Sequence, residues 1–281
     1  MRLAFCKMHG QGNDFVMLNG ISQPHASQLT PAQIRFLADR HFGIGCDQVL
    51  LVEAATRPDA DFRYRIFNAS GEEVEHCGNG ARCFPVFVRD EGLTTKTTLN
   101  VQTINGLIKP TIHPDERVSV DMGLPRFEPI EIPFLADTTQ TKYSLKLLGV
   151  IREVGVVSMG NPHAVQLVKN VMQASVASEG FAIEHHPQFP QRVNAGFMEV
   201  VSPTHIRLRV WERGAGETLA CGTGACAAVV TGIRWGLLDE TVEVDTNGGR
   251  LSVTWQGAKN QYAPVTLTGS AVTVYRGEIT I

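Results

Sequence analysis

Cys77-Gly-Asn-Gly-Ala-Arg-Cys83 occurs a second time in the chain, in altered form, as Cys221-Gly-Thr-Gly-Ala-Cys-Ala227. The two copies lie 144 residues apart, the difference between 221 and 77. Matches at the same offset extend beyond the glycines: they pair Arg63 with Arg207, Arg65 with Arg209, Glu73 with Glu217 and Gly92-Leu93 with Gly236-Leu237. A repeat this long exceeds a solenoid unit of roughly 20–50 residues. The sequence therefore predicts two homologous halves.

Composition is that of a globular protein with a sizeable core. The chain has 281 residues, of which 43% are hydrophobic and 19% charged. Its net charge of −3 lacks the basic excess expected of a nucleic-acid partner. The chain contains no run of about 18 apolar residues, so no membrane span is predicted. The N-terminus lacks the apolar core of a signal peptide. Six cysteines in so long a chain do not make a disulfide scaffold, so free thiols in a reducing cytoplasm are expected.

The pattern along the chain predicts strands, glycine loops, helices and hairpins in each half. Residues 63–67 and 205–211 alternate polar and apolar side chains, as strands do. Helices are expected from Thr30-Pro31 toward His41, from Gly80 to about Glu91 and from Gly224 to about Trp235. Hairpin turns are expected at Asn105-Gly106 and Asn247-Gly248-Gly249, and helix ends at Gly92 and Gly236.

Domain boundaries follow from the repeat. The proline-rich segment Pro125 to Pro133 is predicted to be a linker, and the last strand, Ala271 to Tyr275, to return to the first half. The expected domains are residues 1–123 plus 270–281, and residues 124–269.

A cysteine that leads into a helix indicates thiol chemistry. The N–H groups and positive dipole of a helix start favour the thiolate, the reactive form of a group whose pKa is ordinarily about 8.5. The same N–H groups can bind a carboxylate. Two such helix starts around one α-carbon would place Cys77 and Cys221 on its opposite faces, as a cofactor-free racemase or epimerase needs. The remaining cysteines are expected to be small buried hydrophobes: Cys6, Cys46, Cys83 and Cys226.

Metal and phosphate sites are the rival interpretations of these motifs. Neither copy has the Cys-x-x-Cys spacing of structural zinc sites. No Gly-Lys-Ser/Thr follows the glycines, so a phosphate loop is not indicated. Neither a metal nor another cofactor is expected.

Several motifs together resemble the diaminopimelate epimerase family over essentially the whole chain. They are Lys7 to Phe15, Asp39 to Gln48, Tyr64 to Asn68, Cys77 to Cys83, Met159 to His163, Arg192 to Asn194, Glu212 to Thr218 and Ala220 to Cys226. The resemblance implies an α+β fold of two pseudo-symmetric domains, each a curled mixed sheet around a central helix, with the active site in the cleft between them. It implies a pyridoxal-independent epimerase that interconverts L,L- and meso-diaminopimelate in lysine and peptidoglycan biosynthesis, with no nucleic acid or membrane partner. Homodimers are typical of the family.

The resemblance also implies a role for individual residues. Cys77 and Cys221 match the catalytic pair, one a thiolate base and the other a thiol acid. His163 and Glu212 match the residues that help set their protonation. The implied substrate-binding residues are Asn13, Gln48, Asn68, Gly78, Asn79, Asn161, Asn194, Glu212, Arg213, Gly222 and Thr223. Arg213 can bind a distal carboxylate bidentately, whereas Cys46 and His76 receive no role.

Two alternatives stay open. A proline or hydroxyproline racemase of the same fold would use paired cysteines but would need no arginine for a distal carboxylate. A redox-responsive binding protein would use Cys77 and Cys221 as a switch and would catalyse nothing.

Overall fold

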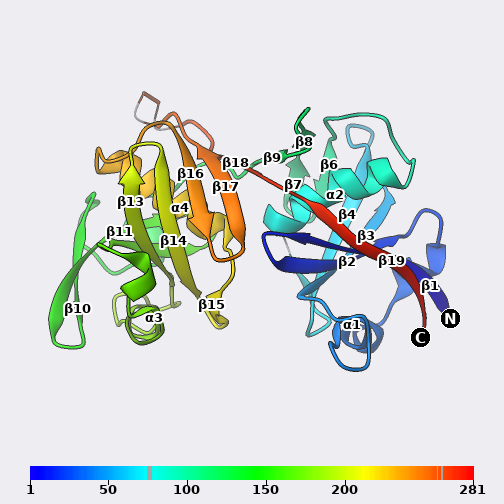
Figure 1. Cartoon of the computed structure of the whole chain (residues 1–281), viewed down its shortest axis with the longest axis horizontal. Helices are drawn as coiled ribbons and strands as arrows, with labels where there is room; N and C mark the ends of the chain where they lie inside the picture. Colours follow the sequence, from blue (N-terminus) through cyan, green and yellow to red (C-terminus); the bar gives the residue numbers. More distant parts are fainter. Residues whose placement is uncertain (75–77, 258, 261) are drawn as a thin grey trace. The chain divides into compact units, whose positions relative to one another are not determined.

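The chain folds into two compact units, each built on a mixed sheet (Figure 1). The computed structural model describes residues 1–74, 78–257, 259–260 and 262–281. The first unit comprises residues 1–120 and 269–281, and the second comprises residues 121–268. Few helices accompany many strands, so the α+β prediction is confirmed.

The sheet of the first unit has the strand order β19-β1-β2-β3-β4-β6-β7, with β5 paired to β4. Its strands are β1 (Arg2–Gly10), β2 (Asn13–Asn19), β3 (Gln48–Ala54), β4 (Phe62–Asn68), β5 (Glu73–Val74), β6 (Val101–Thr103), β7 (Gly106–Ile108) and β19 (Val272–Thr280). A hairpin of β8 (Thr111–Ile112) and β9 (Val118–Asp121) follows. The helices are the 3-10 turn Pro24–Gln28, α1 (Pro31–Ala38) and α2 (Gly78–Asp90).

The sheet of the second unit has the order β10-β11-β12-β13-β14-β16-β17-β18, with β15 paired to β14. Its strands are β10 (Tyr143–Leu147), β11 (Val150–Ser158), β12 (Pro162–Leu167), β13 (Asn194–Ser202), β14 (His205–Glu212), β15 (Gly216–Thr218), β16 (Thr241–Thr246), β17 (Gly249–Thr254) and β18 (Thr266–Gly269). The helices are α3 (Val176–Glu184), α4 (Gly222–Arg234) and the 3-10 turns Pro129–Glu131 and Val171–Gln173.

The two sheets share one design, as the repeat predicts. In the first unit β2 and β3 are parallel, as are β4 and β6. In the second unit β12 and β13 are parallel, as are β14 and β16. A short strand, β5 or β15, precedes α2 or α4 in each case. The two halves therefore share topology as well as sequence.

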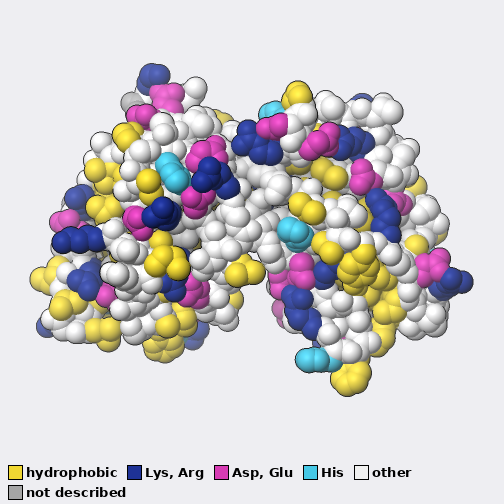
Figure 2. Space-filling view, viewed as in Figure 1, with side chains coloured by type: hydrophobic (Ala, Val, Ile, Leu, Met, Phe, Trp, Pro, Cys, Tyr) yellow, Lys and Arg dark blue, Asp and Glu magenta, His cyan; other side chains and the backbone are white. Residues whose placement is uncertain are grey.

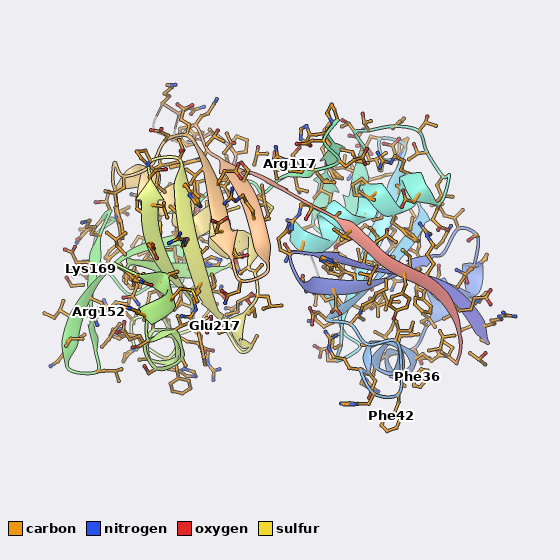
Figure 3. All side chains as sticks on the ribbon, viewed as in Figure 1. Phe36, Phe42, Arg117, Arg152, Lys169 and Glu217 are labelled. Carbon is orange, nitrogen blue, oxygen red and sulfur yellow. The ribbon has the colours of Figure 1, made fainter. Side chains whose placement is uncertain are left out.

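The same ion pair braces this short strand in both units. Arg65 on β4 holds Glu73 on β5 with two hydrogen bonds of 2.8 and 2.7 Å. Arg209 on β14 holds Glu217 on β15 with two of 2.6 and 2.8 Å, and Figure 3 labels Glu217 on this segment. The repeated glutamates therefore brace the short strand that leads into each central helix.

Helices α2 and α4 form the centre of the two units. Nearly every residue of each is buried, and α4 contacts β11, β12, β13, β14 and β17, so the sheet wraps around it. Glycine permits the close approach: a Cβ at Gly80 would lie 2.7 Å from Tyr64 Oη, and one at Gly224 would lie 3.0 Å from Val210 Cγ2. The motif glycines thus serve packing in the first helical turn, because both helices begin two residues earlier than predicted.

Other boundaries agree with the sequence or correct it. Thr30 caps α1 through Gln33, and Gly92 and Gly236 follow α2 and α4 with φ of 69° and 70°. Strand β19 pairs with β1, which confirms the predicted return of the last strand (Figure 1). The linker prediction was wrong: Ile132 is fully buried in the core of the second unit, since this apolar side chain gains more by packing than by solvation.

Candidate active site

The proposed substrate residues of the first unit lie at one edge of its sheet. Strands β2 and β3 are parallel and begin at this edge, with Asn13 and Gln48, and the antiparallel β4 ends there with Asn68. Gln48 Nε2 donates to Asn68 Oδ1 at 2.8 Å. The first turn of α2 arrives at the same edge, because Asn79 Nδ2 donates to Asn13 Oδ1 at 3.1 Å. Four residues singled out from the sequence are thus brought together.

One acceptor in this group is suited to a ligand. The Gln48 Oε1 atom is buried and has no hydrogen-bond partner among the described residues. A buried acceptor without a donor costs about 1–3 kcal/mol. A bound ammonium or hydroxyl group would remove that cost, so the atom is a candidate contact for a ligand donor.

The second unit presents the matching edge of its sheet. Asn161 directly precedes β12, Asn194 begins β13, and Glu212 ends β14. Their places match those of Asn13, Gln48 and Asn68, because His163 lies opposite Asn194 as Phe15 lies opposite Gln48. In the second unit, Asn194 thus stands where the first unit has Gln48, and the carboxylate of Glu212 stands where it has the amide of Asn68.

Asn194 links these strand ends to Arg213. Its Nδ2 donates to Pro162 O at 2.9 Å, and its Oδ1 accepts from Arg213 N at 2.9 Å. The Arg213 guanidinium donates to Gln191 O at 3.1 Å. Asn194 therefore holds the backbone of Arg213, and the carbonyl of Gln191, just before β13, holds its side chain.

Cys221 stands at the N-cap of α4 and is 5% exposed. Burial raises the pKa of its thiol well above the usual range, and the carboxylate of Glu212 raises it further. The Thr223 hydroxyl, 3.5 Å from Cys221 Sγ, and the Gly224 N–H act in the opposite direction. The helix start therefore favours the thiolate through the Gly224 N–H, as expected, but desolvation and the like charge of Glu212 outweigh this effect at Cys221. Cys221 is a neutral thiol at pH 7.

Glu212 is held beside this thiol by β15, the short strand that follows β14. Thr218 Oγ1 donates a short hydrogen bond to Glu212 Oε1. Thr218 ends the motif Glu212 to Thr218, but no role was predicted for it from the sequence. The contact leaves the carboxylate oriented as an acceptor near Cys221 Sγ.

His163 is a buried, neutral imidazole. Burial, together with the charge of Arg213, lowers its pKa from 6.5 to about 3. Its Nε2 lies 3.0 Å from Asn161 Oδ1, an acceptor, so Nε2 carries the hydrogen and Nδ1 keeps its lone pair. His163 can accept a proton or a hydrogen bond through Nδ1, but it carries no charge at pH 7.

Cys6, Cys46, Cys83 and Cys226 are all buried, as predicted for them. Cys77 and His76 lie outside the described residues, and α2 begins at the residue after Cys77. Burial raises the pKa of Cys46 to about 12, which makes it an inert thiol. Cys83 and Cys226 are fully buried in α2 and α4.

No cluster of His, Cys, Asp and Glu within the described ranges is placed to hold a metal. None of the helices described there is long and apolar enough to cross a membrane.

Known proteins match this chain over its whole length. The diaminopimelate epimerase family matches residues 5–128 and 155–274. The chain is 60% identical over 282 residues to a diaminopimelate epimerase of Thioalkalivibrio sulfidiphilus, covering 100% of both, and 57% identical over 286 residues to that of Cupriavidus taiwanensis, covering 99% and 98%.

Solved structures with low sequence identity share the fold. A hydroxyproline epimerase from Agrobacterium vitis has a TM-score of 0.69 at 16% identity, covering 99% of this chain and 92% of that one. A PhzF-family protein from Bacillus anthracis has a TM-score of 0.69 at 16% identity, covering 100% of both. At such identity the likeness is one of architecture.

Proposed function

The chain belongs to the diaminopimelate epimerase family, an isomerase family, and on that premise we propose that it interconverts L,L- and meso-diaminopimelate by proton transfer between two cysteines. The observation that carries the proposal is the buried, protonated Cys221 at the start of α4, beside Glu212. Its repeat partner, Cys77, would supply the second thiol. No pyridoxal phosphate or metal takes part in the proposed reaction.

The reaction is a balanced transfer of one proton. In one direction Cys77, as the thiolate, removes the α-proton and becomes a thiol. The electron pair left on the α-carbon spreads into the reacting carboxylate, where the N–H groups at the starts of α2 and α4 would stabilise it most. Cys221 then donates its proton to the opposite face and becomes a thiolate. In the reverse direction the two cysteines exchange roles.

The protonation states at the site support this assignment. A buried thiol whose pKa is raised, as at Cys221, holds the proton that an acid must deliver. Glu212 would accept a hydrogen bond from the Cys221 thiol. When Cys221 acts as the base, the Glu212 carboxylate would accept the thiol proton. His163, neutral and with Nδ1 unprotonated, would play the corresponding part for the second thiol.

The polar groups around the site fit a substrate with two ammonium and two carboxylate groups. Amides offer both donors and acceptors without a competing charge, and the buried Gln48 Oε1 is matched to an ammonium. Arg213 would hold the distal carboxylate with two hydrogen bonds. The first-turn N–H groups at Gly78, Asn79, Gly222 and Thr223 would hold the reacting carboxylate.

A proline or hydroxyproline racemase is the less favoured alternative. The structures that share the fold include a hydroxyproline epimerase and a probable proline racemase, but their identities of 16 and 17% reflect the fold alone. Neither cyclic substrate has a distal carboxylate for Arg213. Purified protein offered L,L-diaminopimelate and L-proline should turn over only the former.

Single cysteine replacements test the two-thiol chemistry. Cys77→Ala and Cys221→Ala should each lower epimerisation at least about 100-fold, since general acid–base groups contribute about 10²–10⁴-fold. Cys83→Ala and Cys226→Ala are matched controls from the same two helices and should keep rates within a few-fold of wild type. A normal rate in either Cys77→Ala or Cys221→Ala would refute the mechanism, and binding without turnover by wild type would favour the redox-switch alternative.

The remaining family features are part of the same proposal. The enzyme would act in lysine and peptidoglycan biosynthesis in the cytoplasm, where thiols stay reduced. It would form a homodimer, for which edge strand β19 offers a surface: Val274 is 54% and Tyr275 45% exposed, and hydrophobic side chains gather over this region in Figure 2. Sedimentation of wild type and of a Tyr275→Asp variant would test the dimer and this surface.

A further inference from the structure

Two of the proposed substrate residues, Asn13 and Asn79, belong to a hydrogen-bonded chain that is charged at both ends. Asn13 Nδ2 donates to Asp47 Oδ2 at 2.8 Å. Asn79 Nδ2 donates to Asn13 Oδ1 at 3.1 Å. Arg82 Nη2 donates to Asn79 Oδ1 at 2.8 Å. The chain therefore runs from a guanidinium through two amides to a carboxylate.

The charged ends fix the orientation of both amides. An ionised carboxylate can only accept hydrogen bonds, and a guanidinium can only donate them. Asp47 therefore requires the NH₂ group of Asn13, and Arg82 requires the oxygen of Asn79. If either amide rotated by 180°, its oxygen and its NH₂ group would exchange places. A donor would then face a donor at one contact and an acceptor would face an acceptor at the other, so two hydrogen bonds would be lost.

The Asp47 end is itself anchored. Arg40 Nη2 donates to Asp47 Oδ1 at 2.8 Å. The same guanidinium also holds Asp14, through Nη1 at 2.9 Å and Nη2 at 2.8 Å. Asp47 Oδ2 also accepts from the backbone N–H of Asp14 at 3.1 Å, and Lys7 pairs with Asp14 at 2.7 Å. Because Arg40 holds one of its carboxylate oxygens and the backbone N–H of Asp14 the other, Asp47 presents Oδ2 to Asn13 in a fixed direction.

The Arg82 end is anchored inside the core. Arg82 is fully buried within α2. Its guanidinium also donates a short hydrogen bond to Gln11 Oε1, and Gln11 Nε2 donates to Ser270 Oγ at 2.8 Å. Taking a guanidinium out of water is costly, and its placement here supplies Asn79 with an obligate donor. The second copy of the motif has Cys226 near this point of the helix, so this half of the repeat alone carries the cation.

We propose that Asp47 and Arg82 are positioning residues of the epimerase, which act on substrate through Asn13 and Asn79. This inference rests on the proposed function, in which those asparagines contact diaminopimelate. An amide presents a donor to a carboxylate or an acceptor to an ammonium, and turning it over exchanges the two. Asp47 and Arg82 thus fix which group each asparagine offers to the substrate.

A double-mutant cycle on Asp47 and Asn13 tests the inference. Asp47→Asn removes the obligate acceptor and should lower kcat/KM for L,L-diaminopimelate about tenfold, the equivalent of one net hydrogen bond. In an Asn13→Ala background the same change should lower kcat/KM less than about twofold, because the residue through which Asp47 acts is gone. An equal loss in both backgrounds would mean a merely structural role and would overturn the inference.

Controls separate this inference from the proposed function. Asp59→Asn removes another arginine–carboxylate pair, with Arg57 at 2.6 and 2.8 Å on an exposed loop, and should leave kcat/KM unchanged. If Asn13→Ala alone keeps the wild-type kcat/KM, the inference fails, whereas the two-thiol chemistry is judged separately by the Cys77 and Cys221 variants.

A second cycle examines the Arg82 end. Arg82→Met should lower kcat/KM about tenfold in the wild-type background and much less in an Asn79→Ala background. Arg82→Lys keeps a donor and should recover part of the loss. Thermal unfolding of each variant identifies any that fail to fold, in which case the Asp47 cycle still decides. A loss of equal size with and without Asn79 would overturn this half of the inference.

Discussion

Replacing His163 by glutamine should weaken the dependence of stability on pH. The pKa of the buried imidazole is lowered from 6.5 to about 3 by burial and by the charge of Arg213. Between these values the unfolded chain binds a proton that the folded protein does not. The stability that comes from a neutral, buried His163 is therefore complete above pH 6.5 and is lost as the pH falls toward 3.

The size of this effect follows from the interval between the two values. Each pH unit below 6.5 costs about 1.4 kcal/mol, so His163 lowers the stability of wild type by about 2 kcal/mol at pH 5 relative to pH 7.5. Glutamine does not titrate, and its NH₂ group can still donate to Asn161 Oδ1. The His163→Gln variant should lack this part of the loss, while every other titrating group contributes equally to both proteins.

Urea unfolding of wild type and His163→Gln at pH 7.5 and pH 5 measures the difference. Wild type should lose about 2 kcal/mol more than the variant between the two conditions. NMR of the imidazole gives an independent value, since the His163 resonance should stay that of the neutral ring down to about pH 4. Equal losses in the two proteins, or an imidazole that titrates near 6.5, would refute the reasoning.

Three further predictions concern substrate binding, oxidation and packing. Arg213→Met should lower kcat/KM for diaminopimelate about 10–100-fold, because hydrogen bonds to a charged group contribute about 1.5–3 kcal/mol; a loss below twofold in steady-state assays would contradict the distal-carboxylate role. Oxidation should inactivate the enzyme and a reductant should restore it, if Cys77 and Cys221 face each other closely enough to form a disulfide; an activity indifferent to both treatments would count against close facing. Gly180→Ala should destabilise the protein by about 1–3 kcal/mol in thermal unfolding, because its Cβ would lie 2.6 Å from Trp211 Cβ; an unchanged melting temperature would show that the contact relaxes.

Local signals in the sequence predicted much of the fold because their physics is local. Thr30 with Pro31 and Gln33 marks the start of α1, and Gly92 and Gly236 mark the ends of α2 and α4 through left-handed φ. The duplicated motif predicted two similar halves, since homologous sequences fold alike. These elements needed no knowledge of distant contacts.

Elements that depend on distant contacts were missed. Helix α3 has no side-chain cap at Ser175, and its buried face includes Gly180 and Glu184, which do not form an apolar stripe. Gly180 is explained only by Trp211, and Glu184 by a 2.7 Å hydrogen bond from the same indole. Trp211 lies 27 residues from Glu184, so the sequence of the helix alone did not show which of its residues would be buried.

The candidate site likewise contains residues that the sequence predicted and residues that only distant contacts explain. The resemblance and the repeat indicated Asn13, Asn161 and Glu212, and the structure brings each to the edge of its own sheet. Asp47 lies 34 residues from Asn13, and nothing in the sequence linked the two. The protonation of Cys221 depends on burial and on Glu212, neither of which the helix-start argument contains.

The isotopic composition of substrate and product early in the reaction in D₂O tests the two-thiol account most directly. The proton that reaches the product comes from a thiol equilibrated with solvent, and the proton taken from the substrate stays on the other thiol. The meso product should therefore carry one deuterium at the inverted carbon, while recovered L,L-diaminopimelate keeps its hydrogen. Meso product that retains the hydrogen of the substrate at that carbon would contradict the account.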